Sequence, residues 1–303
     1  MSQHLQPTAE DTAAPPPSLS WARRVLAYPV VWALLGSLAI FLTSALYGAA
    51  RPHAAATQLL GALASAVLAI VVYLAVLRGL ARRDTPELPL GQGAVLAPLG
   101  LGLGIGAGFI VLSTLLVAAL GGYSFTRGSA ATGVVLLEAL AMALTAAVGE
   151  ELVFRGLVFR AVEELAGERR PLGAVLAVTV TSLFFGLAHI ANPSATVWSA
   201  LAIAVEAGVL LGVVFLWRRT LWVVIGLHLA WNFVERLLGF AVSGLQAPGL
   251  LEASPHGPTW LSGGDFGLEA SVVPVVLSLA VVALALRLRR PAPQPPALQP
   301  PVR

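Results

Sequence analysis

The chain contains no cysteine, no lysine and little charge of either sign. Charged residues make up 11% of its 303 residues, against about 25% in soluble domains, and hydrophobic residues make up 57%, against roughly 45–50%. A water-soluble globule needs far more charge than this to cover its surface. The composition therefore argues against a soluble enzyme, a disordered chain and a protein that binds nucleic acid.

The lack of cysteine also restricts the chemistry that the chain can perform. It excludes disulfides, zinc sites built from thiolates and a cysteine nucleophile. The Gly-x-Ser-x-Gly motif, which presents the nucleophilic serine of many hydrolases, is absent as well.

Long apolar runs follow one another along the chain, and they predict an all-α polytopic membrane protein. Each run reaches about the 17–25 residues that a spanning helix needs, and a helix pairs its own backbone groups in hydrocarbon. Strands of a lipid-facing barrel would instead alternate over about 10 residues. We expect eight spanning helices, at 25–48, 57–80, 94–120, 130–165, 171–190, 196–217, 221–240 and 270–288. The fourth run is too long for one span, so part of it should project from the bilayer or lie at its surface.

The two ends of the chain are predicted to be disordered tails. Residues 1–24 are polar and contain three consecutive prolines, and residues 291–303 are Pro-rich. Between them, residues 25–290 should form the membrane domain. Arg23 and Arg24 followed by an apolar run also resemble a secretory signal, but the long polar stretch ahead and the seven later runs favour an uncleaved first helix.

The arginines predict how the helices are oriented. Segments between the runs are alternately rich and poor in arginine, and 15 of the 18 arginines fall on one side. By the positive-inside rule this side is cytoplasmic. We therefore expect a multi-pass protein of the plasma (inner) membrane with both termini in the cytoplasm. The absence of lysine and the Ala-rich composition are typical of a bacterium with GC-rich codons.

Glycines recur at every second position of the third run. They are Gly100, Gly102, Gly104, Gly106 and Gly108. Small residues allow spanning helices to approach each other closely, although any one of them can also be apolar filler.

Ionisable and amide side chains gather in the fourth to seventh runs. Each ionisable group costs about 2.5–3.5 kcal/mol to insert at the centre of a span, so each calls for a reason. They are Glu138, Glu150, Glu151, Arg155, His189, Glu206, His228, Asn232, Glu235 and Arg236. This concentration places any chemistry within about residues 130–240.

The spacing of these residues predicts one shared polar site. Glu151 and Arg155 are four residues apart and can pair on one helix face, whereas Glu150 is rotated by about 100° and is free to face a cavity. His228 and Asn232 are also four residues apart, and His189 comes from a third helix. The alternative is that each is structural, since a lone buried histidine is usually a satisfied core residue. Glu206 in particular could simply pair with Arg236 on the next helix.

Three motifs on successive helices resemble those of a known family. They are EExxxR at 150–155, FxxxH at 185–189 and HxxxN at 228–232. In this order the motifs look like those of the CPBP family, which comprises CAAX-protease-like and bacteriocin-processing intramembrane peptidases, also called abortive-infection-like proteins. The family includes the type II CAAX prenyl endopeptidase, and the resemblance covers about 110 residues.

The resemblance implies an eight-helix glutamic endopeptidase that forms no acyl-enzyme, with a catalytic core at 130–240. Glu150, assisted by His189, would activate a water, and His228 and Asn232 would stabilise the oxyanion. Glu151 and Arg155 would support the site. The substrate would be a hydrophobic or membrane-anchored peptide. Peptide hydrolysis needs a base, a positioned water and donors where negative charge develops, which buried Glu, His and Asn side chains can supply.

Three alternatives remain open at this point. Glu150, His189 and His228 could instead bind zinc, although their spacing is not HExxH and we expect no cofactor. Intramembrane Glu and His side chains also relay protons in transporters. A non-catalytic relative could bind peptides as an immunity or scaffold protein.

The depth of the two histidines raises a conflict. With a rise of about 1.5 Å per residue, His228 lies about 10 Å along its helix from Leu221, whereas His189 lies about 27 Å from Pro171. They can share a site only if the helix at 171–190 begins well outside the bilayer, or is tilted or broken.

Overall fold

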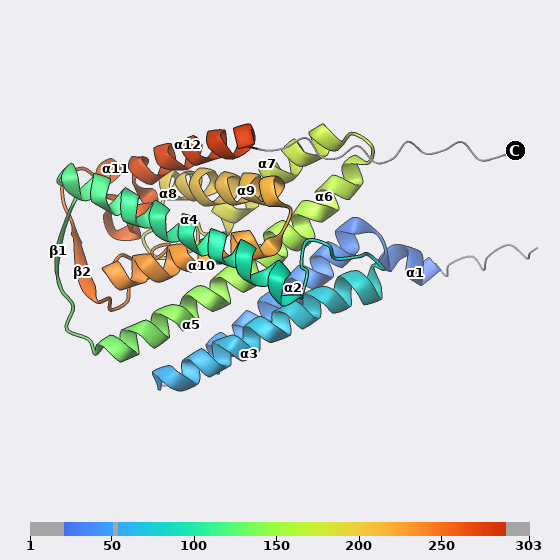
Figure 1. The fold of residues 1–303 in the computed structure, drawn as a ribbon, viewed down its shortest axis with the longest axis horizontal. Helices are drawn as coiled ribbons and strands as arrows, with labels where there is room; N and C mark the ends of the chain where they lie inside the picture. The colour runs from blue at the N-terminus through green and yellow to red at the C-terminus, as the bar shows by residue number, and fades with distance from the viewer. Residues whose placement is uncertain (1–20, 51–53, 289–303) are drawn as a thin grey trace, which may run out of the picture.

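The computed structural model describes residues 21–50 and 54–288, and it is a bundle of long helices with a small sheet at one end (Figure 1). The first half contains α1 (Trp21–Leu26), α2 (Pro29–Ala49), α3 (Ala55–Leu74) with the π-helix η1 (Ala75–Leu80), α4 (Gln92–Ala119), β1 (Tyr123–Arg127), and α5 (Thr132–Glu151) with the π-helix η2 (Leu152–Val158) and α6 (Phe159–Ala166). The second half contains α7 (Arg170–Ala188), α8 (Val197–Ile203) with the π-helix η3 (Ala204–Val209) and α9 (Leu210–Arg218), α10 (Leu221–Leu238), β2 (Leu251–Pro255), α11 (Thr259–Ser262), the 3-10 helices η4 (Gly264–Phe266) and η5 (Leu268–Ala270), and α12 (Val272–Leu288).

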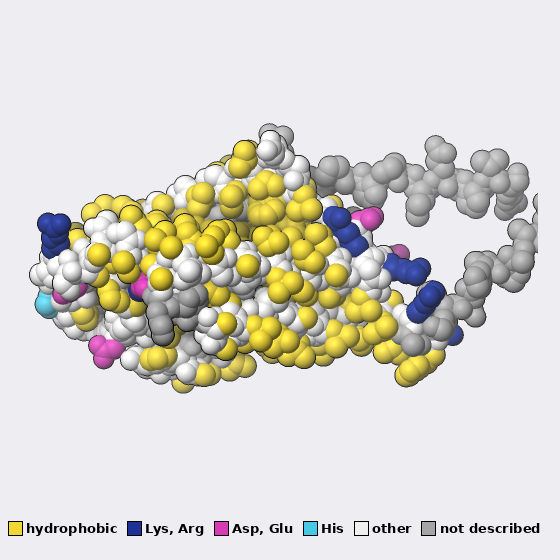
Figure 2. All heavy atoms as spheres, turned by 90° about the horizontal axis from the view of Figure 1, so that it is seen from below, with side chains coloured by type: hydrophobic (Ala, Val, Ile, Leu, Met, Phe, Trp, Pro, Cys, Tyr) yellow, Lys and Arg dark blue, Asp and Glu magenta, His cyan; other side chains and the backbone are white. Residues whose placement is uncertain are grey.

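The chain is a polytopic all-α membrane protein. Within the described residues, seven helical segments are long and apolar enough to cross a membrane: Pro29–Ala49, Ala55–Leu80, Gln92–Ala119, Thr132–Ala166, Pro171–Ala188, Val197–Arg218 and Leu221–Leu238. α12 corresponds to the eighth predicted helix; it is apolar and 17 residues long, and it ends where the described residues end. Figure 2 shows a broad apolar surface over the middle of the molecule and a group of arginines at one end.

The N-terminal boundary differs from the prediction. Trp21–Leu26 form α1, so residues 21–24 are helical rather than part of a tail, and α2 starts only at Pro29. The break lies at Tyr28, whose ψ of 132° is extended, because the ring of a following proline disfavours the helical conformation. Residues 1–20 and the predicted tail at 291–303 lie outside the described residues.

The fourth and fifth predicted helices form a hairpin that extends beyond the neighbouring helices. α5, η2 and α6 are continuous over 35 residues, which agrees with the prediction that this run exceeds one span. α6 and the start of α7 reach further along the bundle than the start of α10 does (Figure 1). Leu221, the first residue of α10, is fully buried, and its backbone N–H donates to the carbonyl oxygen of Glu87 at 2.8 Å. α10 therefore begins inside the protein, whereas α7 begins further out along the bundle. This offset between the two helix starts allows His189 and His228 to lie at the same level although they are at different distances from the starts of their helices.

α4 and α10 pack with their backbones in direct contact, and two glycines make this possible. A Cβ atom on Gly102 would lie 2.1 Å from the carbonyl oxygen of Val223, and one on Gly106 would lie 2.2 Å from that of Leu227. Gly100, Gly104 and Gly108 have nothing within 4 Å of such an atom. Close approach thus explains two of the five glycines in the third run, and it supports the helix that carries His228 and Asn232.

The segment between α10 and α12 folds back over one end of the bundle, which the apolar pattern did not predict. Its strand β2 pairs antiparallel with β1, from Tyr123 opposite Pro255 to Arg127 opposite Leu251. Val242 and Leu245 form an isolated bridge around Ser243 (φ 50°) and Gly244 (φ 82°), which is a tight turn with both central residues left-handed. We call residues 242–245 the cavity turn, because the turn lines the site described below.

Candidate active site

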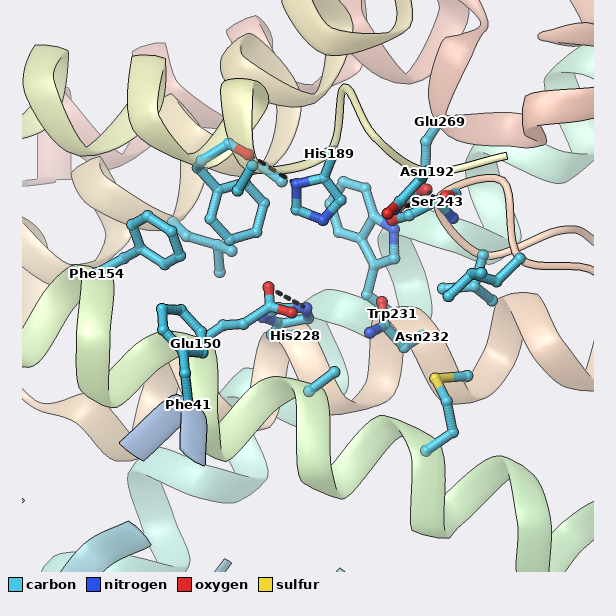
Figure 3. A pocket seen from close by; sticks show the side chains of 18 residues that line it. Phe41, Glu150, Phe154, His189, Asn192, His228, Trp231, Asn232, Ser243 and Glu269 are labelled. Carbon is cyan, nitrogen blue, oxygen red and sulfur yellow. Dashed lines mark hydrogen bonds and ion pairs between the residues drawn. The ribbon is translucent and has the colours of Figure 1, made fainter. Parts of the chain in front are cut away.

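A cavity of about 330 Å³ lies between α5, α7, α10 and the cavity turn (Figure 3). All four predicted catalytic residues, Glu150, His189, His228 and Asn232, line it. The complete lining is Phe41, Met142, Ala146, Glu150, Phe154, Phe185, Ala188, His189, Asn192, Ala207, Leu211, His228, Trp231, Asn232, Val242, Ser243, Leu245 and Glu269. The structure thus brings together side chains from both halves of the predicted core and from the segment after it.

The two adjacent glutamates at the end of α5 have different environments. Glu151 is fully buried and accepts a hydrogen bond from Nη1 of Arg155 at 3.0 Å, as their spacing predicts. Nη2 of Arg155 donates to the carbonyl oxygens of Ala207 and Gly208 at 3.0 and 3.1 Å. Glu150 faces the cavity instead, and its side chain is 25% exposed. One carboxylate is therefore neutralised and the other is open to a ligand.

His228 is oriented by the neutralised carboxylate, a contact that the sequence did not reveal. Its Nδ1 lies 2.8 Å from Oε1 of Glu151. Because an ionised carboxylate can only accept, Nδ1–H donates this bond. Nε2 is then directed toward the cavity, 4.0 Å from Oε2 of Glu150.

His189 lies across the cavity from His228 (Figure 3). It is the residue directly after α7, and its Nδ1 lies 2.7 Å from the carbonyl oxygen of Phe185, one turn back. Since a carbonyl can only accept, Nδ1–H donates and Nε2 keeps a free lone pair. The ring of Phe185 lies near both imidazoles, with its centroid 4.8 Å from that of His189 and 6.1 Å from that of His228.

Asn232 lies one helical turn after His228, and both side chains line the same cavity. It is 5% exposed, and its amide makes no hydrogen bond to another described residue. Its neighbour Trp231 stacks on Phe109 of α4 at a centroid distance of 4.6 Å, which fixes this turn of α10. A buried amide without a partner is available to a ligand in the cavity.

The family of this region follows from a comparison with family models. The family described as type II CAAX prenyl endopeptidase Rce1-like matches residues 131–234, which run from the start of α5 to within α10. Over residues 131–234 the chain is similar to the Rce1-like family. A search of the curated proteins and a search of the solved structures gave no match. The match confirms the resemblance seen in the three motifs, and at the level of the family it identifies a CAAX-type intramembrane endopeptidase.

Three cavity residues were missed by the sequence analysis, and two of them lie outside the Rce1-like region. Asn192 donates from Nδ2 to the carbonyl oxygen of Ser243 at 2.9 Å, and the N–H of Ser243 donates to Oε2 of Glu269 at 2.5 Å. Burial raises the pKa of Glu269, while nearby His189 and the hydrogen bonds from Ser243 lower it in part. Asn192 follows His189 by three residues and could have been noticed, whereas no pattern in the sequence connects Glu269 to the site.

The predicted pair of Glu206 and Arg236 is wrong. Nη2 of Arg236 lies 3.8 Å from Oε2 of Glu138, because the Arg236 side of α10 packs on α5. Glu206 belongs to η3, which packs on α7 and α12, and neither of its buried carboxylate oxygens has a hydrogen-bond partner among the described residues.

The side chains of the alternative metal site, Glu150, His189 and His228, are not arranged as a set of metal ligands in this structure. In the described part of the chain, no group of three or more His, Asp or Glu side chains is close enough together to hold one. Oε2 of Glu150 and Nε2 of His228 are 4.0 Å apart, whereas two donors on one tetrahedral zinc lie roughly 3.3 Å apart.

Proposed function

We propose that the protein is a glutamic intramembrane endopeptidase, in which Glu150 activates the water that attacks a peptide bond. The observation that carries this proposal is the difference between the contacts of the two adjacent glutamates, Glu150 and Glu151. Glu151 is occupied by Arg155 and His228, whereas Glu150 faces the cavity without an arginine partner. The match of residues 131–234 to the Rce1-like family model supports the same reaction.

The first step places a water between Glu150 and the two imidazoles. Glu150 accepts one proton of this water, and the free Nε2 of His189 accepts a hydrogen bond from the other and orients it. The resulting hydroxide attacks the carbonyl carbon of the substrate. The 4.0 Å between Glu150 and His228 leaves room for a water 2.8 Å from each, at an angle of roughly 90°.

The second step stabilises the charge that develops on the carbonyl oxygen. Asn232 donates from its amide, and His228 donates from Nε2 in its protonated form. The Glu151 carboxylate, which accepts from Nδ1–H, favours that protonated form. When the tetrahedral intermediate collapses, the proton held by Glu150 passes to the leaving nitrogen. No acyl-enzyme forms, and the water supplies both the hydroxyl added to the carbonyl carbon and the proton added to the nitrogen.

The substrate in this proposal is a hydrophobic or membrane-anchored peptide, and the reaction uses no metal. The apolar walls around Phe41, Met142 and Phe154 suit apolar side chains. Activity should persist in a strong chelator, and loss of activity on chelation with recovery on added zinc would contradict this part of the proposal.

The orientation in the membrane is proposed from the arginine distribution. The end of the molecule that carries most of the arginines in Figure 2 faces the cytoplasm. A reporter fused after Arg290 should therefore give a cytoplasmic signal, and a periplasmic signal would overturn the topology.

Cleavage of a peptide library tests the proposed reaction directly. The purified full chain in detergent is incubated with the library, and products are read by mass spectrometry for the wild type, Glu150→Gln and the control Glu252→Gln. Glu252 is an exposed residue of β2 and does not line the cavity. We expect cleavage by the wild type and the control, and none by Glu150→Gln with an unchanged melting temperature. Full activity of Glu150→Gln would refute the assigned base. Peptide binding without cleavage by any variant would indicate a non-catalytic relative.

A further inference from the structure

The cavity is chemically different at its two ends. Figure 3 shows the aromatic rings of Phe41 and Phe154 at one end and the group of Asn192, Ser243 and Glu269 at the other. The proposed catalytic residues lie between them. A peptide lying along the cavity with its scissile bond at Glu150 therefore places apolar side chains at one end and meets Glu269 at the other.

Glu269 is held rigidly but is only partly satisfied. It is 4% exposed, and Oε2 accepts the N–H of Ser243 at 2.5 Å. The cavity turn, which contains Ser243, is itself held in place, because the N–H of Gly244 donates to the carbonyl oxygen of Phe266 at 2.9 Å. The hydroxyl of Ser243 bonds the same carboxylate, so Ser243 occupies two of its roughly four lone-pair sites. The carboxylate is thus anchored at Ser243, and its remaining lone pairs are available to a ligand in the cavity.

The cavity contains two acidic groups, and the basic side chains that line it among the described residues are the imidazoles of His189 and His228. Glu150 and Glu269 both line it, and no arginine does; the whole chain has no lysine. The guanidinium of Arg155 lies behind the wall, where Glu151 and two backbone carbonyls occupy it. A buried carboxylate without a cation is costly, so a ligand that brings a positive charge to Glu269 gains an ion pair there.

We propose that Glu269 is a specificity-determining residue that binds a basic side chain, arginine or lysine, on one side of the scissile bond of the substrate. The inference rests on the proposed function and specifies its substrate class further. The raised pKa of Glu269 agrees with it, because burial disfavours the anion by more than the nearby His189 and Ser243 offset, and a further cation relieves this.

The competing role for Glu269 is structural, as a brace for the cavity turn through Ser243. A brace would affect stability and the cleavage of all substrates alike. A specificity residue changes the ratio between basic and neutral substrates. The ratio is therefore the measurement that separates the two roles.

The experiment compares matched peptides on the purified full chain in detergent. A cleaved library peptide is made in versions with Lys, Gln or Glu at each position flanking the scissile bond, and kcat/KM is measured for the wild type, Glu269→Gln, Glu269→Lys and the control Glu252→Gln. For the wild type and the control, we expect Lys to exceed Gln by about tenfold at one position, as a charge-assisted hydrogen bond supplies. Glu269→Gln should reduce this ratio to about one, and Glu269→Lys should favour the Glu peptide.

Two further outcomes keep the inference testable on its own. If no peptide is cleaved, Lys, Gln and Glu versions of a library peptide that the chain binds are used instead. Their binding to Glu150→Gln, measured by fluorescence anisotropy, should still show the Lys preference, so that the proposed reaction can fail while the inference stands. Equal affinity of the wild-type cavity for Lys and Gln peptides overturns the inference, whether or not the Glu269 variants fold. An unchanged ratio in a folded Glu269→Gln variant also overturns it.

Discussion

Replacing Gly106 by alanine should separate α4 from α10 and disturb the site from a distance. The new Cβ would lie 2.2 Å from the carbonyl oxygen of Leu227, and ordinary contact requires roughly 1 Å more. The obstacle is backbone, so α10 itself has to shift. His228 is the next residue, and a misplacement of about 1 Å can cost about 100-fold in rate. We expect a loss of about 1–3 kcal/mol in stability from overpacking and a large fall in kcat.

Gly104→Ala is the matched control for this prediction. Gly104 lies on the same helix, is exposed, and has nothing within 4 Å of an added Cβ. Alanine there should leave stability equal or slightly higher, because it is the better helix former. Thermal unfolding in detergent and cleavage of a common peptide would be measured for both variants. If Gly106→Ala has the same melting temperature as Gly104→Ala and keeps full activity, the close approach of α4 and α10 is not what positions His228.

Three other substitutions test the site in different ways. Asn232→Ala should lower kcat by about 10²–10³ with little change in KM, and an unchanged kcat would remove Asn232 from the oxyanion site. Arg155→Met leaves the buried Glu151 without its cation and should cost about 3–5 kcal/mol in unfolding experiments, whereas a cost near zero would show that the pair is dispensable. The stability of Glu269→Gln relative to the wild type should increase as the pH rises. Because the pKa of Glu269 is raised in the folded wild type, its protonated carboxyl stabilises the folded state fully below the ordinary carboxyl pKa. This stabilisation is lost as the pH rises through the raised pKa of the folded state. Melting temperatures at pH 5 and pH 8 measure this, and a difference between the two proteins that stays constant would contradict it.

The helices and the candidate residues could be predicted because their signals are local. Apolar runs of 18 to 35 residues identify spanning helices without any knowledge of their neighbours, and a charged side chain within such a run is conspicuous. The pairing of Glu151 with Arg155 also follows from helix geometry alone. The same reasoning failed for Glu206 and Arg236, since proximity between different helices depends on how each helix is rotated, and the apolar pattern runs around most of each helix.

The contribution of the segment between α10 and α12 could not be predicted in the same way. β1 and β2 are separated by more than a hundred residues, and their register depends on how the helices between them pack and where those helices end. Glu269 looks like one acidic residue in a polar loop, yet it is buried and lines the cavity. Its position depends on the left-handed turn at Ser243 and Gly244 and on contacts with distant segments.

By itself, the sequence determined that the chain crosses a membrane as helices and that two acids, two imidazoles and an amide are embedded in them, because hydropathy and spacing along one helix are short-range properties. Only the tertiary structure decided that Glu151 orients His228, that Glu150 faces the cavity, and that Glu269 closes its far end. Those relations depend on how separate helices and a returning loop pack together, and packing is a property of the whole chain.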